Sequence, residues 1–461
     1  MSIMDFENSR VSPFSATKTI LNYVKGGNPL IGATLLALLC ANLPYVSDFY
    51  FQFWEKEIKL QIGDFNLFSH NGHPMTIMEF INDALMAVFF FMIGLEIKRE
   101  VLVGELSSFK KALLPIIGAV GGMVVPVLFF FLMSSGTDYT RGAAIPMATD
   151  IAFSLGVLAM LGSRVPLSVK VFLTTLAVVD DIGGIIVIAT CYSDGIGVSY
   201  LFYSVAAIAL LLFGSVFKVQ SKMYYLILGG VVWYLFLNSG IHPTIAGVIV
   251  AFCIPEKPVF HPKKYICIIR NSIARFPEKD DAGMDANGRK IILSREQMDS
   301  LKEIESASDK VISPLQELED TLHPVVNYLI IPLFAFANAG IYLGDMSFSH
   351  LFGGVGLAVI CSLFLGKFVG ILLFSWLAVK FKLAPMPQGA DWRMLSAVAM
   401  LGGIGFTVSL FIANLSFPGS EYADTLNSAK LGILVGSLLA GIVGYLHLKI
   451  TLPPASKTAD N

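Results

Sequence analysis

Residues 167–191, LSVKVFLTTLAVVDDIGGIIVIATC, decide the fold class. This stretch is apolar enough to cross a bilayer, which takes about 17–25 residues. It nevertheless carries two adjacent acids, Asp180 and Asp181, in its middle. An aspartate at the centre of a membrane helix costs roughly 2.5–3.5 kcal/mol on insertion scales, so it needs a partner or a function. The stretch therefore predicts a membrane helix whose acids pair with or bind cations.

The rest of the chain has the composition of a multi-span membrane protein. It has 461 residues, of which 55% are hydrophobic and 14% charged, and a mean hydropathy of +0.70. About twelve runs are long enough to cross a membrane; they lie at 30–46, 83–97, 112–133, 143–161, 167–191, 199–217, 223–239, 241–255, 324–343, 352–379, 394–415 and 428–448. We therefore expect an all-α membrane protein, with membrane lipid as its surroundings.

Charge and cysteine usage exclude several other classes. The formal net charge is only -2, which gives no basic surface for nucleic acid. The five cysteines are widely spaced and mostly apolar in context, so neither a disulfide framework nor a metal site is expected. The first apolar run begins near Leu30 and lacks the pattern of a removable signal peptide. We expect no cofactor and no enzymatic activity.

Lysine and arginine positions predict the orientation, because these residues collect on cytoplasmic flanks. With the N-terminus inside, the outer loops hold only Lys56, Lys59, Arg141 and Lys430. This asymmetry places both termini in the cytoplasm. The expected parts are a cytoplasmic segment at 1–29, a first membrane part with eight helices at 30–256, a cytoplasmic insertion at 257–323, a second membrane part with four helices at 324–450, and a cytoplasmic tail at 451–461.

Two connections are long enough to fold by themselves. Alternation over residues 58–68, with a turn at Gly63-Asp64, predicts an external β-hairpin, and an irregular loop is the alternative. In the insertion, Ser294 and Gln297 resemble a capping box that opens a helix. Its apolar side carries Leu301, Ile304, Ile312 and Leu315, and Pro314 would bend or end it. The insertion is either a solvated spacer or a regulatory or docking element.

Two further ionisable residues lie in mid-span. Asp150 is central in 143–161 and Lys367 is central in 352–379. Neighbouring residues on a helix diverge by about 100°, so one acid of the Asp180-Asp181 pair can face an aqueous ion cavity while the other faces the helix of Lys367. A carboxylate in a partly dry cavity binds either a proton or a cation, which permits exchange, and sodium prefers such oxygen ligands. A structural ion network and a cation channel are the alternatives.

Two predicted spans contain helix breakers. Pro146 interrupts the fourth span, and Gly402, Gly403 and Gly405 interrupt the eleventh. Irregular backbone inside a bilayer is tolerated only against protein or water, so both breaks should face an internal cavity. Their corresponding places in the two halves are typical of transporters built from inverted-topology repeats. A kinked but purely structural helix is the alternative.

Together these residues resemble the NhaA family of sodium/proton antiporters, which is itself a known example of the inverted-repeat rule. The matching stretches follow the family order over about residues 20–450; they are Met86–Phe90, Gly94–Glu100, Ala148–Phe153, Asp180–Gly183, Gly240–Gly247, Phe334–Gly340, Gly366–Gly370 and the Gly402–Gly405 cluster. The resemblance implies twelve transmembrane helices, with the fourth and eleventh unwound in mid-membrane and crossing each other.

The resemblance also implies functional roles. Asp181 matches the principal cation-binding aspartate, Asp180 the acid that partners the lysine matched by Lys367, and Thr149 and Asp150 the helix-crossing support. It implies electrogenic export of sodium or lithium in exchange for protons, a homodimer joined through the hairpin, and a location in the bacterial inner membrane.

The implied activation by alkaline pH is assigned to the cytoplasmic mouth. Glu96, Glu100 and His242 match there, and a solvated ring of charge and an interfacial histidine are the alternatives. Two departures from the family pattern are present. Phe368 stands where the family's Gly-Lys-Pro pattern has proline, and the 257–323 connection is longer than the family leads us to expect.

Overall fold

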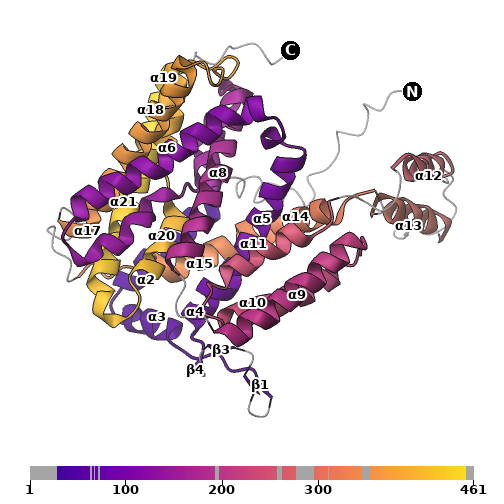
Figure 1. The fold of residues 1–461 in the computed structure, drawn as a ribbon, viewed down its shortest axis with the longest axis horizontal. Helices are drawn as coiled ribbons and strands as arrows, with labels where there is room; N and C mark the ends of the chain where they lie inside the picture. Colours follow the sequence, from indigo (N-terminus) through magenta and orange to yellow (C-terminus); the bar gives the residue numbers. More distant parts are fainter. Residues whose placement is uncertain are drawn as a thin grey trace, which may run out of the picture. The chain divides into compact units, whose positions relative to one another are not determined.

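Helices make up most of the described chain, which Figure 1 shows as a computed structural model. The structure describes residues 28–62, 65–66, 68–70, 73–192, 197–256, 262–276, 295–309, 311–344 and 353–452. Helices suit an apolar chain in lipid, because each backbone N–H and C=O must find a partner within its own segment. By their internal contacts, the residues fall into two units.

The first unit takes in residues 1–89, 100–194 and 325–461. Its helices are α2 (Asn28–Asn42), α3 (Val46–Trp54), α4 (Ile77–Phe80), η1 (Ile81–Leu85), η2 (Glu105–Ser107), α6 (Phe109–Ser134), η3 (Asp138–Met147), α7 (Ile151–Ala159), η4 (Gly162–Arg164), α8 (Leu167–Cys191), η5 (Val326–Ile330), α15 (Ile331–Asn338), α17 (Gly354–Cys361), η6 (Ser362–Gly366), α18 (Lys367–Lys380), α19 (Trp392–Leu401), α20 (Phe406–Ser416), η7 (Ser420–Tyr422) and α21 (Ala423–Thr451). Of these, η1, η5 and η6 are π-helical turns.

The second unit takes in residues 90–99 and 195–324. It contains most of α5 (Met86–Leu102), followed by α9 (Val198–Val216), α10 (Lys222–Leu237), α11 (Thr244–Cys253), α12 (Pro262–Ala274), α13 (Arg295–Asp309) and α14 (Pro314–Val325). Its apolar core includes Leu95, Leu211, Tyr225 and Leu318. The α12 and α13 helices lie side by side, as Figure 1 shows, and the Ser272 hydroxyl donates to Glu303 at 2.8 Å. The predicted insertion thus contains packed helices.

The composition of these helices confirms an α-helical membrane protein with several spans. Among the described residues, seven helices are long and apolar enough to cross a membrane, and three bent pairs bring the number to as many as ten. The α10 and α11 helices are shorter apolar helices. The number of twelve spans stays a prediction.

Several boundaries differ from those expected. The run predicted at 30–46 contains α2, which ends at Asn42, and α3 (Val46–Trp54) follows it at a 115° bend. The run at 83–97 belongs to a longer helix from Ile77 to Leu102, because the flanking polar residues continue the helical turn. The run at 324–343 already begins at Pro314, since proline fits the first turn of a helix, where its missing N–H has no partner to lose.

Two further expectations change with the structure. The helix predicted to open near Ser294 ends at Asp309, so that Ile312 and Leu315 lie beyond it; Ser294 itself is outside the described residues. Lys430, expected in an outer loop, lies in α21 and is buried, with 7% of its surface exposed.

Glycines bring α6 and α18 into backbone contact. A Cβ atom on Gly370 would lie 2.2 Å from the Gly121 carbonyl oxygen, and one on Gly366 would lie 2.8 Å from Pro126 Cα. Small residues four apart allow membrane helices to approach this closely, where packing rather than hydrophobic burial drives their association. The two contacts hold this helix one residue before and three residues after the buried Lys367.

Short strands occupy the segment predicted to form an external hairpin. Strands β1 (Gln61–Ile62) and β2 (Phe65–Asn66) pair antiparallel, with Gln61 opposite Asn66 and Ile62 opposite Phe65. Strands β3 (Ser69–His70) and β4 (His73–Pro74) form a second antiparallel pair. The turn residues 63 and 64 lie outside the described residues.

Candidate ion site

A buried ion pair joins the two membrane helices that the sequence singled out. Lys367 Nζ lies 2.5 Å from Asp180 Oδ2, and both side chains are 0% exposed. Lys367 is the middle residue of the helical stretch Gly354–Lys380, and Asp180 lies close to the middle of α8. Since helices rise about 1.5 Å per residue, Lys367 is about 20 Å from either end of its helix and cannot reach water by extending its side chain.

Thr149 completes this pair. Its hydroxyl oxygen accepts a hydrogen bond from Lys367 Nζ at 2.9 Å. The same hydroxyl lies 2.6 Å from Asp180 Oδ2 and 2.9 Å from the Gly402 carbonyl oxygen, both of which are acceptors. A hydroxyl carries one hydrogen, so it donates to one of these two acceptors at a time. Thr149 therefore belongs to the ion pair itself as well as to the helix crossing.

Two bent helix pairs meet beside the Lys367–Asp180 ion pair. Residues 148–150 separate η3 from α7, with a 45° bend, and residues 402–405 separate α19 from α20, with a 44° bend. The Asp150 N–H donates to the Ile404 carbonyl at 2.6 Å, which joins the two breaks directly. Backbone groups freed by the interruptions thus find partners in each other, as buried polar groups must.

The Asp150 carboxylate accepts hydrogen bonds at the N-termini of α7 and α20, the helices that follow the two bends. Its Oδ1 accepts from the Phe153 N–H at 3.0 Å and thereby caps α7. Its Oδ2 accepts from the Thr407 N–H at 3.2 Å and the Thr407 hydroxyl at 2.8 Å, in the first turn of α20. A carboxylate is favourable at helix N-termini because their N–H groups and dipoles carry partial positive charge. One acid therefore stabilises two helix starts.

Serine hydroxyls join the remaining half-helix ends. Ser154 in α7 donates to the Leu401 carbonyl at the end of α19, at 3.1 Å. Ser409 in α20 donates to the Ile145 carbonyl in η3, at 2.6 Å. The α7 helix is thus joined to α19, and the α20 helix to η3, which links the two bent helix pairs.

Asp181 follows Asp180 on α8 and is also buried, with 4% of its surface exposed. The Asp180 Oδ1 atom makes no hydrogen bond with the described residues, although Oδ2 is engaged by Lys367 and Thr149. The site therefore offers carboxylate oxygens next to a threonine hydroxyl and a carbonyl, which are the ligand types of hard cations. No cluster of three or more His, Cys, Asp or Glu side chains suited to a metal occurs in the described part of the chain.

A π-helical turn positions Lys367. The turn η6 runs from Ser362 to Gly366 and ends directly before the lysine. Such turns insert an extra residue into an α-helix, change the direction of the following side chains, and are frequent at functional sites. Together with the glycine contact to α6, this turn directs the lysine toward α8.

The predicted pH-sensing residues are divided between the units. Glu96 and His242 belong to the second unit and Glu100 to the first. Both glutamates are partly buried, and Glu100 Oε2 accepts from the Glu105 N–H at 3.1 Å. His242 is 8% exposed, and its Nδ1 lies 2.8 Å from the Thr244 hydroxyl. Their role in pH sensing stays a prediction.

Sequence reasoning gave no role to Thr407 or to a set of asparagines. Asn338 donates to Asn82 at 2.9 Å, and Asn414 donates to Asn338 at 2.8 Å, which links η1, α15 and α20. Thr407 directly follows the glycine cluster, and its place in the first turn of a resumed helix was the signal that could have identified it.

Comparison with known proteins shows which family this sequence matches. A model of the family described as "Na+/H+ antiporter 1" matches residues 18–448. The chain belongs to this family. The match confirms the family resemblance drawn from the motifs and makes the protein a multi-pass membrane protein of a family of antiporters rather than of enzymes.

Named relatives in this antiporter family are similar over nearly their whole length. The chain is 54% identical over 440 residues to the Na(+)/H(+) antiporter NhaA of Phocaeicola vulgatus, with 95% of this chain and 96% of the relative covered. It is 55% identical over 425 residues to the protein of the same name from Bacteroides thetaiotaomicron (92% and 94% covered). Identity to the Helicobacter pylori protein of that name is 42% over 434 residues (93% and 95% covered).

Proposed function

We propose that the chain is an electrogenic antiporter that exports sodium or lithium ions in exchange for protons, by alternating access around Asp180 and Asp181. The observation that carries the proposal is the fully buried Lys367–Asp180 pair at the meeting point of two interrupted helices. The names of the relatives, all Na(+)/H(+) antiporters, support the same substrates.

Competition for the carboxylates explains exchange. A sodium ion that binds Asp181 and Asp180 competes with Lys367 for Asp180, the lysine's acid partner. A buried ammonium that loses its counter-ion favours its neutral form, because burial disfavours charge. Sodium binding therefore releases the lysine proton and any proton held by Asp181. Proton binding in turn restores the ion pair and expels sodium.

This scheme makes transport electrogenic. One sodium ion displaces a proton from each of two groups, Lys367 and Asp181, so that more positive charge enters as protons than leaves as sodium. The membrane potential then drives export with about 2.3 kcal/mol per net charge and 100 mV.

Alternating access requires other conformations than the one described. Here Asp180 and Asp181 are 0% and 4% exposed, which corresponds to a closed site. We propose that the paired half-helices move to open it, because they are held by hydrogen bonds between side chains and backbone at their breaks. We further propose that both breaks lie in mid-membrane, within two inverted-topology repeats. The α10 and α11 helices would complete twelve spans.

Orientation, assembly and regulation complete the proposal. Both termini would lie in the cytoplasm of a bacterium whose inner membrane holds the protein, and burial of Lys430 leaves even fewer basic residues for the outer loops. The β1–β2 hairpin would join two copies. Glu96, Glu100 and His242 would set the pH dependence, together with the helices of the 257–323 connection.

The test is sodium-dependent collapse of a preformed pH gradient in everted vesicles, measured across a range of pH. Asp181→Asn should abolish the collapse while leaving the amount of inserted protein unchanged. Asp391→Asn is the matched control, because this acid caps α19 at an exposed position outside the site. Retained exchange in Asp181→Asn would remove the site assignment. A cation channel would instead dissipate a sodium gradient and leave the pH gradient intact.

A further inference from the structure

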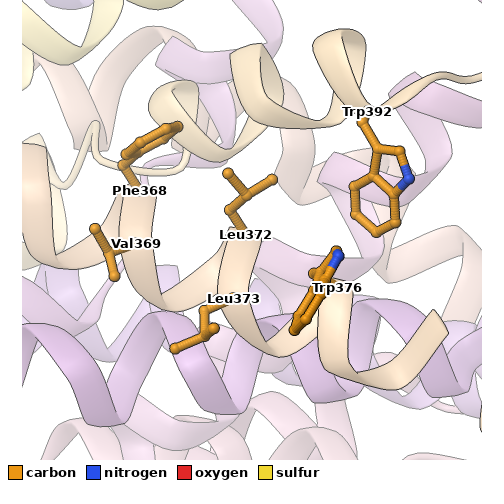
Figure 2. Close-up of a pocket in the computed structure, with 6 residues that line it drawn as sticks. All are labelled: Phe368, Val369, Leu372, Leu373, Trp376 and Trp392. Carbon is orange, nitrogen blue, oxygen red and sulfur yellow. The ribbon is translucent and has the colours of Figure 1, made fainter. Parts of the chain in front are cut away.

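An open apolar groove runs along the outer side of α18, away from the ion site. It has a volume of about 380 Å³ and is lined by Phe368, Val369, Leu372, Leu373, Trp376 and Trp392. Figure 2 shows Phe368 and Val369 at one end and the two tryptophans at the other. Val369, Leu373 and both tryptophans are between 37% and 43% exposed. In a bilayer, this groove faces hydrocarbon.

Positive charge gathers at the tryptophan end. Lys380 Nζ lies 4.3 Å from the centre of the Trp376 ring, and exposed Arg393 directly follows Trp392. Exposed Lys382 lies in the turn after α18. None of these three cations forms an ion pair with a described residue, and the nearby acid Asp391 accepts a hydrogen bond from the Met394 N–H at 2.7 Å. The groove mouth is therefore electropositive.

The rise from the inner end of the groove to Lys380 matches the thickness of one leaflet. From Phe368 to Lys380 the helix rises by about 18 Å, while half of a hydrocarbon core is about 15 Å. Lys380 then reaches the headgroup layer when Phe368 is near the bilayer centre, and Trp376 and Trp392 occupy the interface that tryptophan prefers. A diacyl lipid with its chain on Phe368 would place its headgroup at the cations.

We propose that this groove is a binding site for an anionic phospholipid, whose acyl chain lies along α18 and whose phosphate binds Lys380, with Arg393 adding to the attraction. Charge complementarity distinguishes an anionic from a zwitterionic lipid, because each nearby lysine or arginine attracts negative headgroups. The chain end of the lipid contacts Phe368, the residue that replaces the family's proline directly after Lys367.

Tryptophan fluorescence gives a direct test. The chain has four tryptophans, so Trp54→Phe with Trp233→Phe leaves Trp376 and Trp392 as reporters of the groove. This protein is titrated in neutral micelles with phosphatidylglycerol or phosphatidylcholine, each brominated on the acyl chains to quench tryptophan. We expect half-maximal quenching at an about fivefold lower mole fraction of phosphatidylglycerol, corresponding to one lysine contact.

Two variants and one control sharpen the test. Lys380→Gln should abolish the preference for phosphatidylglycerol, and Val369→Phe should weaken quenching by both lipids by filling the groove at an exposed position. Lys449→Gln is the matched control, since Lys449 Nζ lies 5.8 Å from the Tyr445 ring at the end of α21, outside the groove. It should keep the full preference.

Equal quenching by both lipids would overturn the proposal, because the groove would then contact bulk lipid without selecting an anionic headgroup. Absent quenching by both would also overturn it, because a second copy of the chain would then cover the groove. The measurement involves no transport, so failure of the lipid site and failure of the antiport proposal are distinguishable.

Discussion

Removing the charge of Lys367 tests the central ion pair most directly. In Lys367→Met, the Asp180 carboxylate stays buried at 0% exposure and keeps only the Thr149 hydroxyl as a donor. Breaking a buried pair from one side costs about 3–5 kcal/mol, because the remaining charge has lost its compensation. We expect the free energy of unfolding to fall by about this amount at neutral pH. Lowering the pH should reduce the loss, since a protonated Asp180 carries no charge.

Unfolding in lipid bicelles by denaturant titration, followed by circular dichroism, measures this loss. Adding Asp180→Asn to Lys367→Met should recover most of it, because an uncharged amide replaces the stranded carboxylate. Lys430→Met is the matched control: Lys430 is also buried in a membrane helix, at 7% exposure, but forms no ion pair with any described residue. It should leave stability unchanged or improve it, because a desolvated charge is removed. An equally small effect of both lysine variants would refute the reasoning.

Two other predictions concern the frame around the site. Thr407→Val removes a hydroxyl that donates to the buried Asp150 carboxylate at 2.8 Å; the free energy of unfolding should fall by about 1.5–3 kcal/mol, and Thr407→Ser should restore it. Gly370→Leu forces a side chain into the Gly121 carbonyl, 2.2 Å from the Cβ position, and should abolish monodisperse protein in size-exclusion chromatography. Gly230→Leu, at a helix position with nothing within 4 Å, should not; equal losses in both would contradict the packing argument.

The sequence predicted the ion pair because charge in lipid is costly. Asp180 and Lys367 each lie centrally in an apolar run, and mutual compensation was the cheapest arrangement. That Lys367 pairs with Asp180 rather than with Asp181 was predicted from the family resemblance. The breaks near Pro146 and the glycine cluster were also visible, since these residues disfavour helix interiors.

Other features depend on geometry that residue types do not encode. Thr149 was assigned to the helix crossing, whereas its hydroxyl also contacts Asp180 and Lys367; only the direction of the unwound backbone decides this. The π-helical turn before Lys367 has an ordinary apolar sequence, so no sequence pattern predicts it. Helix ends were missed where the apolar run and the helix differ, as at Pro314, because hydropathy reports lipid contact rather than helical hydrogen bonding.

The Thr149 hydroxyl has one hydrogen, so the charge of Asp180 decides which acceptor it faces by rotation about the Cβ–Oγ1 bond. An ionised Asp180 is the stronger acceptor, because hydrogen bonds to charged groups exceed those to carbonyls. If the proposed binding of a proton or a sodium ion neutralises that carboxylate, the hydroxyl can rotate toward the Gly402 carbonyl, 2.9 Å away, at the end of α19. Under the proposed function, the bend between α19 and α20 would thus respond to binding at Asp180 through the rotation of one hydroxyl group, before any backbone segment moves.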